Sequence, residues 1–362
     1  IEHFNFYSYP AVTSQWLKFT DKAIWDSLFF TFGGKAYGIF ALLFGFSFFI
    51  QYNNEKQKGN DFRLRFLWRL FLLFIWGNIN AMFFTGEILV LYSIVGIVLI
   101  FVVRLSTKTI LILSFICLLQ PMEWYKVIAA LINPDAPAPV SRASYYFGIA
   151  KEVQANGNFI ETVKMNLWEG QLASLTWAWE HGRMFQTAAY FMMGLLLGRK
   201  KLFINTDSNL RFWRNTLIIS IICFFPLNGL AGMLRPFIDN PQVLTSLRLI
   251  LTSLAKFSFM FFIISVFVIL YYSSKMSNLL EKLAPYGKMS LTCYITQSIV
   301  GSILFYNWGF GLHSKLGITY SFLAGICIFL VQYIFAVWWF KRYKHGPLEY
   351  IWKKATWIGV KR

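Results

Sequence analysis

The chain has 362 residues, of which 57% are hydrophobic, 20% are aromatic and only 14% are charged. A soluble domain carries roughly 25% charged residues, so this composition excludes an ordinary soluble protein and favours one that spans a membrane. The net charge of +18 would also allow nucleic-acid binding, but the placement of the cations along the chain argues against it.

Nine apolar segments are each long enough to cross a hydrocarbon core of about 30 Å, which needs a helix of about 20 residues. They are continuous apolar runs rather than alternating ones, so they predict helices and not the strands of a membrane barrel. The predicted fold class is therefore an all-α, polytopic transmembrane helix bundle. The predicted spans are 36–52, 66–85, 87–104, 108–132, 181–199, 213–234, 246–272, 289–308 and 317–340.

The basic residues gather on one side of these spans when the spans are taken alternately. That side receives 22 of the 34 Lys and Arg residues, in the segments 56–69, 104–108, 199–214, 275–288 and 341–362. Short loops rich in cations stay in the cytoplasm, which predicts a multi-pass protein of the bacterial cytoplasmic membrane with a cytoplasmic C-terminus. Such cations contact anionic headgroups, so membrane lipids are the expected partners and nucleic acid is not.

The number of spans is odd, which has a consequence for the N-terminus. With a cytoplasmic tail, nine spans place residues 1–35 outside, with 21–32 lying in the membrane interface. We therefore expect one further span before Ile1 in the complete protein, giving ten helices.

The remaining segments complete a single transmembrane domain over 1–362, with four spans in 36–132, five in 181–340 and a tail over 341–362. The loop 133–180 is predicted to be extracytoplasmic. It opens with a proline-rich stretch, and two short helices follow, the second beginning at Asn158 in a capping box with Glu161. A loop of this length is typical of a lid or cap over a cavity.

Charged residues inside or beside the spans are the first candidates for function, because a charge at membrane depth costs a few kcal/mol. Lys256 lies near the middle of its span, where it either faces an anionic substrate group or is a snorkelling or ion-paired structural lysine. Glu87 follows Asn80 by seven residues and could be a base; the alternative is a cap on the next helix. His181 and Arg183 could combine an acid or base with an anion clamp, or lie in the interface.

Two further patterns concern binding. Ser290, Tyr294, Gln297 and Ser298 recur on one helix face, which either lines a cavity or joins helices. The four cysteines lie within apolar spans, and no group of residues has the spacing of a metal site or of a phosphate-binding loop. No metal is therefore expected.

Three blocks of residues carry a family resemblance. They are Gly34-Lys35 followed by Phe40 to Gly45; Arg65 to Tyr92, with Arg69 and Gly86-Glu87-Ile88-Leu89; and Leu283 to Trp352, with Ala284 to Thr292, Tyr294, Gln297-Ser298 and Gly346-Pro347-Leu348-Glu349. Together they resemble domain of unknown function 418 (DUF418), the YeiB-type polytopic membrane proteins. Where that family usually has His in the second block, this chain has Asn80, which cannot titrate.

The resemblance implies an architecture similar to the transmembrane acyltransferases. It implies transfer of an acyl group from acyl-CoA, a donor substrate rather than a tightly bound cofactor, to a carbohydrate or envelope-lipid acceptor. We expect Glu87 and His181 to deprotonate the acceptor hydroxyl. The expected substrate-binding residues are Arg69, Asn80, Arg183, Lys256, Tyr294 and Gln297.

Two other functions compete with acyl transfer. One is a transporter or flippase for an anionic or lipid-linked solute, which would use the same cations as its binding site. The sequence has neither the repeat symmetry nor the paired Gly- and Pro-broken helices typical of such transporters. The other is a non-catalytic membrane scaffold.

Overall fold

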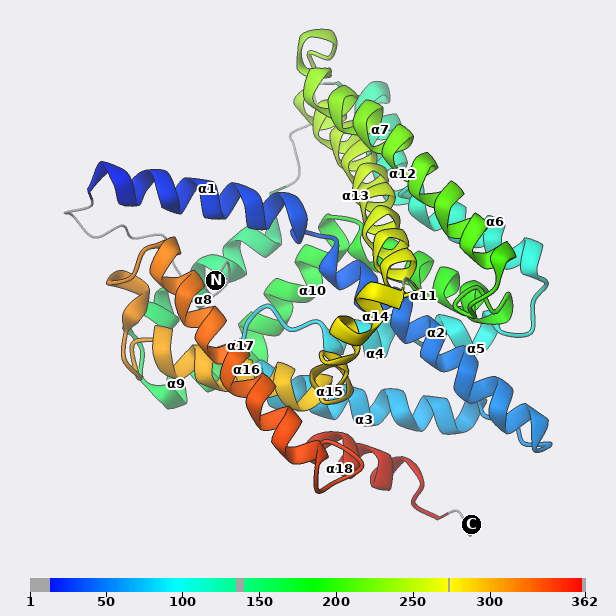
Figure 1. The fold of residues 1–362 in the computed structure, drawn as a ribbon. Coiled ribbons are helices and arrows are strands. Elements are labelled where there is room, and N and C mark those ends of the chain that lie inside the picture. Colours follow the sequence, from blue (N-terminus) through cyan, green and yellow to red (C-terminus); the bar gives the residue numbers. More distant parts are fainter. Residues whose placement is uncertain (1–13, 135–139, 273, 360–362) are drawn as a thin grey trace.

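The computed structural model describes residues 14–134, 140–272 and 274–359 (Figure 1). These ranges form helices and turns and contain no strand, which confirms the all-α fold class. The first 13 residues and most of the predicted proline-rich stretch, 135–139, lie outside the described residues.

Every predicted span coincides with helical structure. The helices are α2 (Ala36–Gln57), α3 (Arg63–Ala81), α4 (Leu89–Val95) with α5 (Val98–Val102), α6 (Thr107–Leu118) with α7 (Pro121–Ile132), α11 (Arg183–Arg199), α12 (Asp207–Met233), α13 (Pro241–Tyr271), α16 (Ser290–Phe305) and α17 (Ile318–Phe340). An additional helix, α1 (Gln15–Thr31), precedes them, and α14 (Ser274–Glu281) and α15 (Ala284–Lys288) join α13 to α16.

Fewer of these helices than predicted have the length and composition of a membrane span. In the described chain there are four such segments, namely Gln15–Gln57, α12, α13 and α17, or five if α6 and α7 form one bent span. The count of nine is therefore not confirmed. At 1.5 Å per residue, the 17 residues of α11 and the 16 of α16 extend over only roughly 26 and 24 Å. The apolar helices nevertheless support a membrane protein.

A break divides the segment that we predicted as one continuous span over 108–132. Gln120 has a left-handed backbone with φ 58°, and Pro121 opens α7, so the two helices are bent by 46°. A residue before proline avoids the helical region, which explains the position of the break. The buried Gln120 side chain packs on Gly182, where an added Cβ would lie 1.9 Å from Gln120 Oε1.

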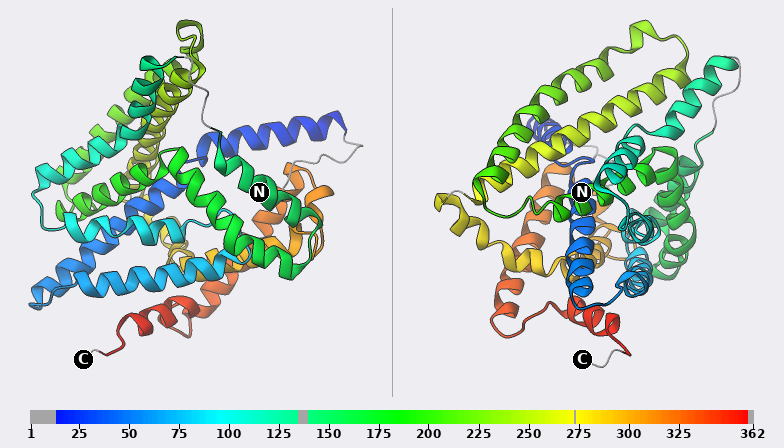
Figure 2. Two further views of the ribbon diagram at one scale, coloured as in Figure 1. Left: turned by 180° about the vertical axis from the view of Figure 1, so that it is seen from behind. Right: turned by 90° about the vertical axis from the view of Figure 1, so that its right-hand side faces the viewer.

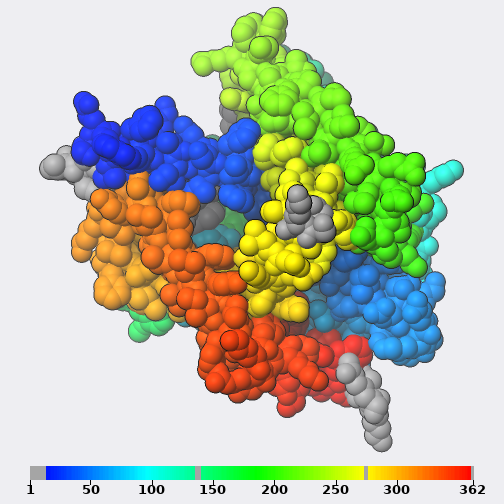
Figure 3. Space-filling view, viewed as in Figure 1, coloured from blue at the N-terminus to red at the C-terminus, as the bar shows by residue number. Residues whose placement is uncertain are grey.

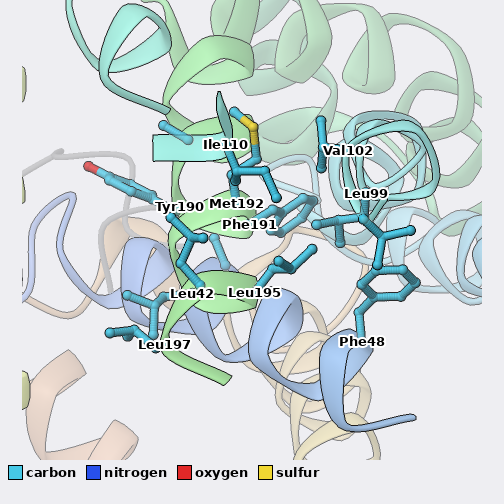
Figure 4. Packing of buried hydrophobic residues seen from close by; sticks show 14 of the residues in the cluster. Leu42, Phe48, Leu99, Val102, Ile110, Tyr190, Phe191, Met192, Leu195 and Leu197 are labelled. Carbon is cyan, nitrogen blue, oxygen red and sulfur yellow. The ribbon is translucent and has the colours of Figure 1, made fainter. Parts of the chain in front are cut away.

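The centre of the molecule is the close contact between α2 and α11. A Cβ at Gly45 would lie 1.9 Å from the carbonyl oxygen of Phe191, and one at Gly194 would lie 1.9 Å from that of Leu42. Small residues on both helices thus let the two backbones touch, as is common in membranes. Figure 4 shows the surrounding core, in which Leu42, Tyr190 and Leu195 lie together.

The other helices surround this pair. α12 and α13 run side by side, with α7 along α13, and the three form one arm of the molecule (Figures 1 and 2). Large apolar side chains of α17 such as Val331 and Ile334 are 68% and 65% exposed. Leaving such area in water costs roughly 25 cal/mol per Å², so we expect lipid to cover this helix.

The described part of the predicted loop, from 140 to 180, is largely helical. It contains α8 (Arg142–Asn156), α9 (Phe159–Met165), a π-helical turn (Asn166–Gly170) and α10 (Gln171–Glu180), more helices than the two that we predicted. The capping box at Asn158 is confirmed, with both hydrogen bonds to Glu161 at 3.0 Å.

Buried amides attach this loop to the turn between α3 and α4. Gln154 donates to Thr85 and, at 3.2 Å, to Asn166 Oδ1, and Asn166 donates to the carbonyl oxygen of Met82 at 3.0 Å. Ser174 donates to the carbonyl oxygen of Thr85. The loop is thus a fixed cap over the turn that carries Glu87.

The predicted tail contains one helix, α18 (Pro347–Thr356). Its Glu349 accepts hydrogen bonds from the backbone and hydroxyl of Thr292, at 3.0 and 2.6 Å, at the start of α16. A carboxylate at a helix N-terminus is stabilised by the helix dipole. Thr292 and Glu349 belong to two motifs of the third sequence block, Ala284 to Thr292 and Gly346 to Glu349. Their contact holds the tail against the bundle, which gives both motifs a structural role.

Candidate functional site

A cavity of about 1090 Å³ lies where the fixed loop meets the bundle. Its walls come from α1, α2, α4, α8, α10, α11 and α13 and from the turns that carry Gly34 and Glu87. Figure 3 shows that the surface is hollowed between α1 and the segment around α13 and α14. Among the described lining residues, four are cations (Lys151, Arg183, Arg248 and Lys256) and one is a carboxylate (Glu87).

One face of α13 supplies the longest wall. Thr245, Arg248, Thr252 and Lys256 line the cavity at spacings of three and four residues, which places them on a single helical face. The eleven helical steps from Thr245 to Lys256 extend over roughly 16 Å at 1.5 Å per residue. Arg248 is exposed and Lys256 is half-buried, so positive charge continues from the surface into the cavity.

Arg183 and Lys256 meet at Gly34. This glycine has a left-handed backbone with φ 73°, and a Cβ there would lie 3.0 Å from Lys256 Cδ and 3.3 Å from Arg183 Nη2. Only glycine combines this conformation with room for both side chains. Two cations from helices distant in sequence are thereby held together.

Aromatic rings hold the Arg183 guanidinium in place. It lies 4.3 Å from the centre of the Tyr37 ring and 5.1 Å from that of Trp177, and its Nη1 donates to Gln186 Oε1 at 3.4 Å. The Tyr37 hydroxyl also donates to Gln186. Cation–π contacts leave the edge of a guanidinium able to donate to an anion.

His181 stacks on Trp177, with ring centres 4.9 Å apart. Its Nδ1 lies 3.1 Å from the carbonyl oxygen of Trp177. A carbonyl can only accept, so Nδ1 carries the proton of this bond, and in the neutral ring Nε2 is then the acceptor. This is the tautomer that a general base requires.

Glu87 lies in the turn between α3 and α4 and is buried. Its Oε2 accepts from Asn80 and its Oε1 accepts from the backbone of Leu89, the first residue of α4. The capping role is therefore present, and the carboxylate also lines the cavity. Asn80 is fully buried and does not line the cavity. It contacts the site through its hydrogen bond to Glu87.

Glu180 is the last residue of α10, directly before His181, and joins α10 to the start of α8. Its carboxylate accepts from Ser141 Oγ at 2.7 Å and from the backbone of Arg142 at 2.9 Å. Burial alone would raise the pKa of Glu180, but these hydrogen bonds outweigh it and hold the pKa below its ordinary value. Lys126 donates to the Glu180 carbonyl at 3.1 Å and forms an ion pair with Glu123 at 2.6 Å.

The structure places three other predicted residues away from the cavity lining. Arg69 lies 4.6 Å from the ring of Trp352 on α18. Tyr294 reaches the backbone of Ile88, next to Glu87. Gln297 donates to Tyr286 at 2.8 Å and to Gln332 at 3.0 Å, and so joins α16 to α15 and to α17.

Several cavity residues were not predicted from the sequence, among them Arg248, Thr252 and Tyr37. Arg248 and Thr252 could have been found, because they precede Lys256 at helical spacing. Tyr37 gives no sequence pattern, since its role depends on the contact between α2 and α11. No group of three metal-ligating side chains occurs among the residues that the structure describes.

Comparison with known proteins gives a family for the C-terminal part of the chain. Residues 197–359 match the model described as protein of unknown function DUF418. This match confirms the predicted family resemblance. The DUF418 match includes α12 to α18, and thus the α13 wall of the cavity, whereas Glu87, His181 and Arg183 precede it.

The similar curated proteins are uncharacterised. The chain is 25% identical over 358 residues to uncharacterized protein YxaH of Bacillus subtilis, covering 93% of this chain and 83% of that protein. It is 24% identical over 346 residues to an uncharacterized 39.9 kDa protein in the amylase 3′ region of Bacillus acidopullulyticus, covering 91% and 82%. Uncharacterized protein YeiB of Escherichia coli is 30% identical over 79 residues, 22% of this chain and 20% of that protein. No solved structure matches.

Proposed function

We propose that this protein is a membrane acyltransferase that moves an acyl group from acyl-CoA to a carbohydrate or envelope-lipid acceptor bound in the cavity. The observation that carries the proposal is the composition of the cavity wall. One cavity contains an imidazole whose Nε2 can accept a proton, a buried carboxylate and four cations. These are the groups that acyl transfer to a hydroxyl needs.

The chemistry follows from those positions. His181 Nε2 takes the proton of an acceptor hydroxyl, and the oxygen attacks the carbonyl carbon of the thioester. The carbon–sulfur bond then breaks, the acyl group stays on the acceptor oxygen, and the departing thiolate of CoA receives a proton. The negative charge of the adjacent Glu180 stabilises the imidazolium that forms, and Glu87 is a second proton acceptor in the cavity. Arg183 and Lys256 stabilise negative charge on the reacting oxygen or on the acceptor.

A second cleft supports a binding place for the phosphates of the donor on the predicted cytoplasmic side. Its volume is about 390 Å³, and it lies between Pro285 and the end of α17. Four of its seven lining residues are cations, namely Lys288, Lys341, Arg342 and Lys344. Arg342 is held 4.5 Å from the ring of Trp338. Phosphate groups pair well with such a concentration of Lys and Arg.

One observation favours a transporter as the second candidate. α6 and α7 form a broken apolar helix, and the break at Gln120 packs on Gly182, beside His181 and Arg183. Broken helices next to a binding site are common in secondary transporters. On this alternative, the same cations bind an anionic solute and no covalent bond changes.

The deciding experiment uses the purified full chain in proteoliposomes, with acetyl-CoA labelled in the acetyl group and an envelope extract. The acyltransferase proposal predicts label in an acceptor product, and a raised melting temperature with CoA. Absence of both would overturn it. Uptake of labelled anionic solutes without covalent label would instead establish the transporter.

A Glu87→Gln variant refines the assignment. The substitution removes the one carboxylate among the described lining residues, and glutamine cannot accept a proton, so we expect label transfer to fall by about 10²-fold. Lys108→Gln is a suitable control, because Lys108 is exposed and lines neither cavity.

A further inference from the structure

We infer that the acceptor is an anionic amphiphile, whose charged headgroup lies at Arg183 and Lys256 and whose apolar part lies along α1 and α13. That this ligand is the acceptor of the acyl group rests on the proposed function. The binding that it describes does not depend on turnover.

The headgroup position follows from the cations. Arg183 and Lys256 meet at Gly34, and Arg248 continues the same charge toward the surface. With Glu87 as the one carboxylate among the described lining residues, the wall carries a clear excess of positive charge. Cations brought together in a partly enclosed space repel one another, and a bound anion removes that cost.

The apolar part has its own wall. Leu244 and Leu249 lie beside and between the cations of α13, and Phe29 of α1 also lines the cavity. Leu91, Phe147 and Leu175 line the same cavity from α4, α8 and α10. A free sugar or an inorganic anion would leave these side chains in contact with water, whereas an acyl or prenyl chain would cover them.

The size and position of the cavity fit the same ligand. Its volume of about 1090 Å³ exceeds the roughly 300–1,000 Å³ of sites for drug-sized molecules. Phe29 and Leu249 both belong to candidate membrane-spanning segments, Gln15–Gln57 and α13. A cavity bounded by such segments is reached from the lipid phase, so its ligand is expected to be a membrane component.

The test measures binding by thermal stability of the purified full chain in maltoside detergent. The probes are dihexanoyl phosphatidylglycerol, dihexanoyl phosphatidylcholine and sn-glycerol 3-phosphate. We expect the anionic lipid to raise the melting temperature at concentrations at least about tenfold lower than either other probe, because only it has both the charge and the chains. Equal effects of the two lipids, or an equal effect of glycerol phosphate, would overturn the inference.

Paired variants locate the site. Arg248→Gln should weaken the response to phosphatidylglycerol by about tenfold. Arg211→Gln should leave it unchanged, because Arg211 is an equally exposed arginine on α12 that does not line the cavity. Leu249→Asn should weaken binding of phosphatidylglycerol but not of glycerol phosphate. An unchanged response in both Arg248→Gln and Leu249→Asn would contradict the placement.

The outcomes for the site and for the reaction are separate. Selective binding of phosphatidylglycerol without label transfer would keep the anionic amphiphile as ligand and overturn the acyltransferase. Label transfer to a neutral sugar, with no selective lipid binding, would support the acyltransferase and overturn the anionic amphiphile as ligand.

Discussion

Each residue of the candidate site depends on a partner that fixes its orientation or its charge. Trp177 orients His181, Asn80 holds Glu87, and Gly34 lets Arg183 and Lys256 approach each other. The sequence indicated Glu87, His181, Arg183 and Lys256 because charge inside apolar segments is costly. It could not indicate which of them share a cavity, since that depends on contacts between helices far apart in the chain.

Asn80 offers a test of these partnerships. Asn80→Ala would leave the buried Glu87 carboxylate without one of its donors, which costs about 1–3 kcal/mol for an unsatisfied buried group. We therefore expect a lower melting temperature. In a Glu87→Gln background the charge is gone, so the additional effect of Asn80→Ala should be clearly smaller. Equal effects in both backgrounds would show that Asn80 acts independently of Glu87.

Gly34 offers a second test. Its left-handed backbone strains any other residue, and a Cβ there would lie 3.0 Å from Lys256 Cδ and 3.3 Å from Arg183 Nη2, so both side chains would have to shift. We expect Gly34→Ala to weaken binding of the anionic lipid by about tenfold or more, as the cations are pushed apart. Gly148→Ala is the matched control, because Gly148 also lines the cavity and a Cβ there would meet nothing within 4 Å.

The helices determine where these residues lie, and the positions at which helices start and break follow local sequence rules. Pro121 explains the bend between α6 and α7, and the Asn158–Glu161 pair begins α9. The positions of the apolar helices could be predicted from hydrophobicity alone. Hydrophobicity alone did not determine how many helices have the length of a membrane span. The sequence predicted full spans at the short helices α11 and α16 and at the divided pair α4 and α5.

The contact between α2 and α11 gives a prediction at this scale. Gly45→Ala or Gly194→Ala would place a methyl group 1.9 Å from a backbone oxygen of the facing helix. The helices must then separate, and we expect a destabilisation of about 1–3 kcal/mol, measured as a lower melting temperature. Gly229→Ala on α12 meets nothing within 4 Å. It should leave stability unchanged or raise it slightly, because alanine is the better helix former.

The junction between α8 and α10 is expected to depend on pH. The pKa of Glu180 lies below its ordinary value in the folded protein, so its hydrogen bonds stabilise the junction above the unfolded pKa of about 4.3. That contribution is lost as the pH falls through the folded pKa. The protection of backbone amides at the start of α8, measured as exchange relative to the intrinsic rate at each pH, should therefore fall below about pH 4. Glu180→Gln should remove this pH dependence. Wild-type protection that is the same at pH 7 and pH 3 would contradict this account.

The whole molecule combines an apolar exterior, a fixed helical cap and a positively charged cavity beneath it. An exposed apolar surface on α17 and a cavity bounded by candidate membrane-spanning segments agree with the proposal that the substrate is taken from the membrane. Hydrophobicity in the sequence was sufficient for the fold class, and three blocks of specific residues were sufficient for the family resemblance. The cavity itself required the structure, because it is formed by seven helices whose meeting no local pattern encodes.

The most direct measurement of the central claim is single-turnover transfer of label from acetyl-CoA by the wild type and by His181→Gln, in lipid vesicles with envelope extract. We expect transfer by the wild type and a loss of about 10²-fold or more in the variant, because glutamine cannot accept the hydroxyl proton. Lys108→Gln should remain within about twofold of the wild type. Label transfer at the wild-type rate by His181→Gln, or none by the wild type, would contradict the proposed role of the cavity.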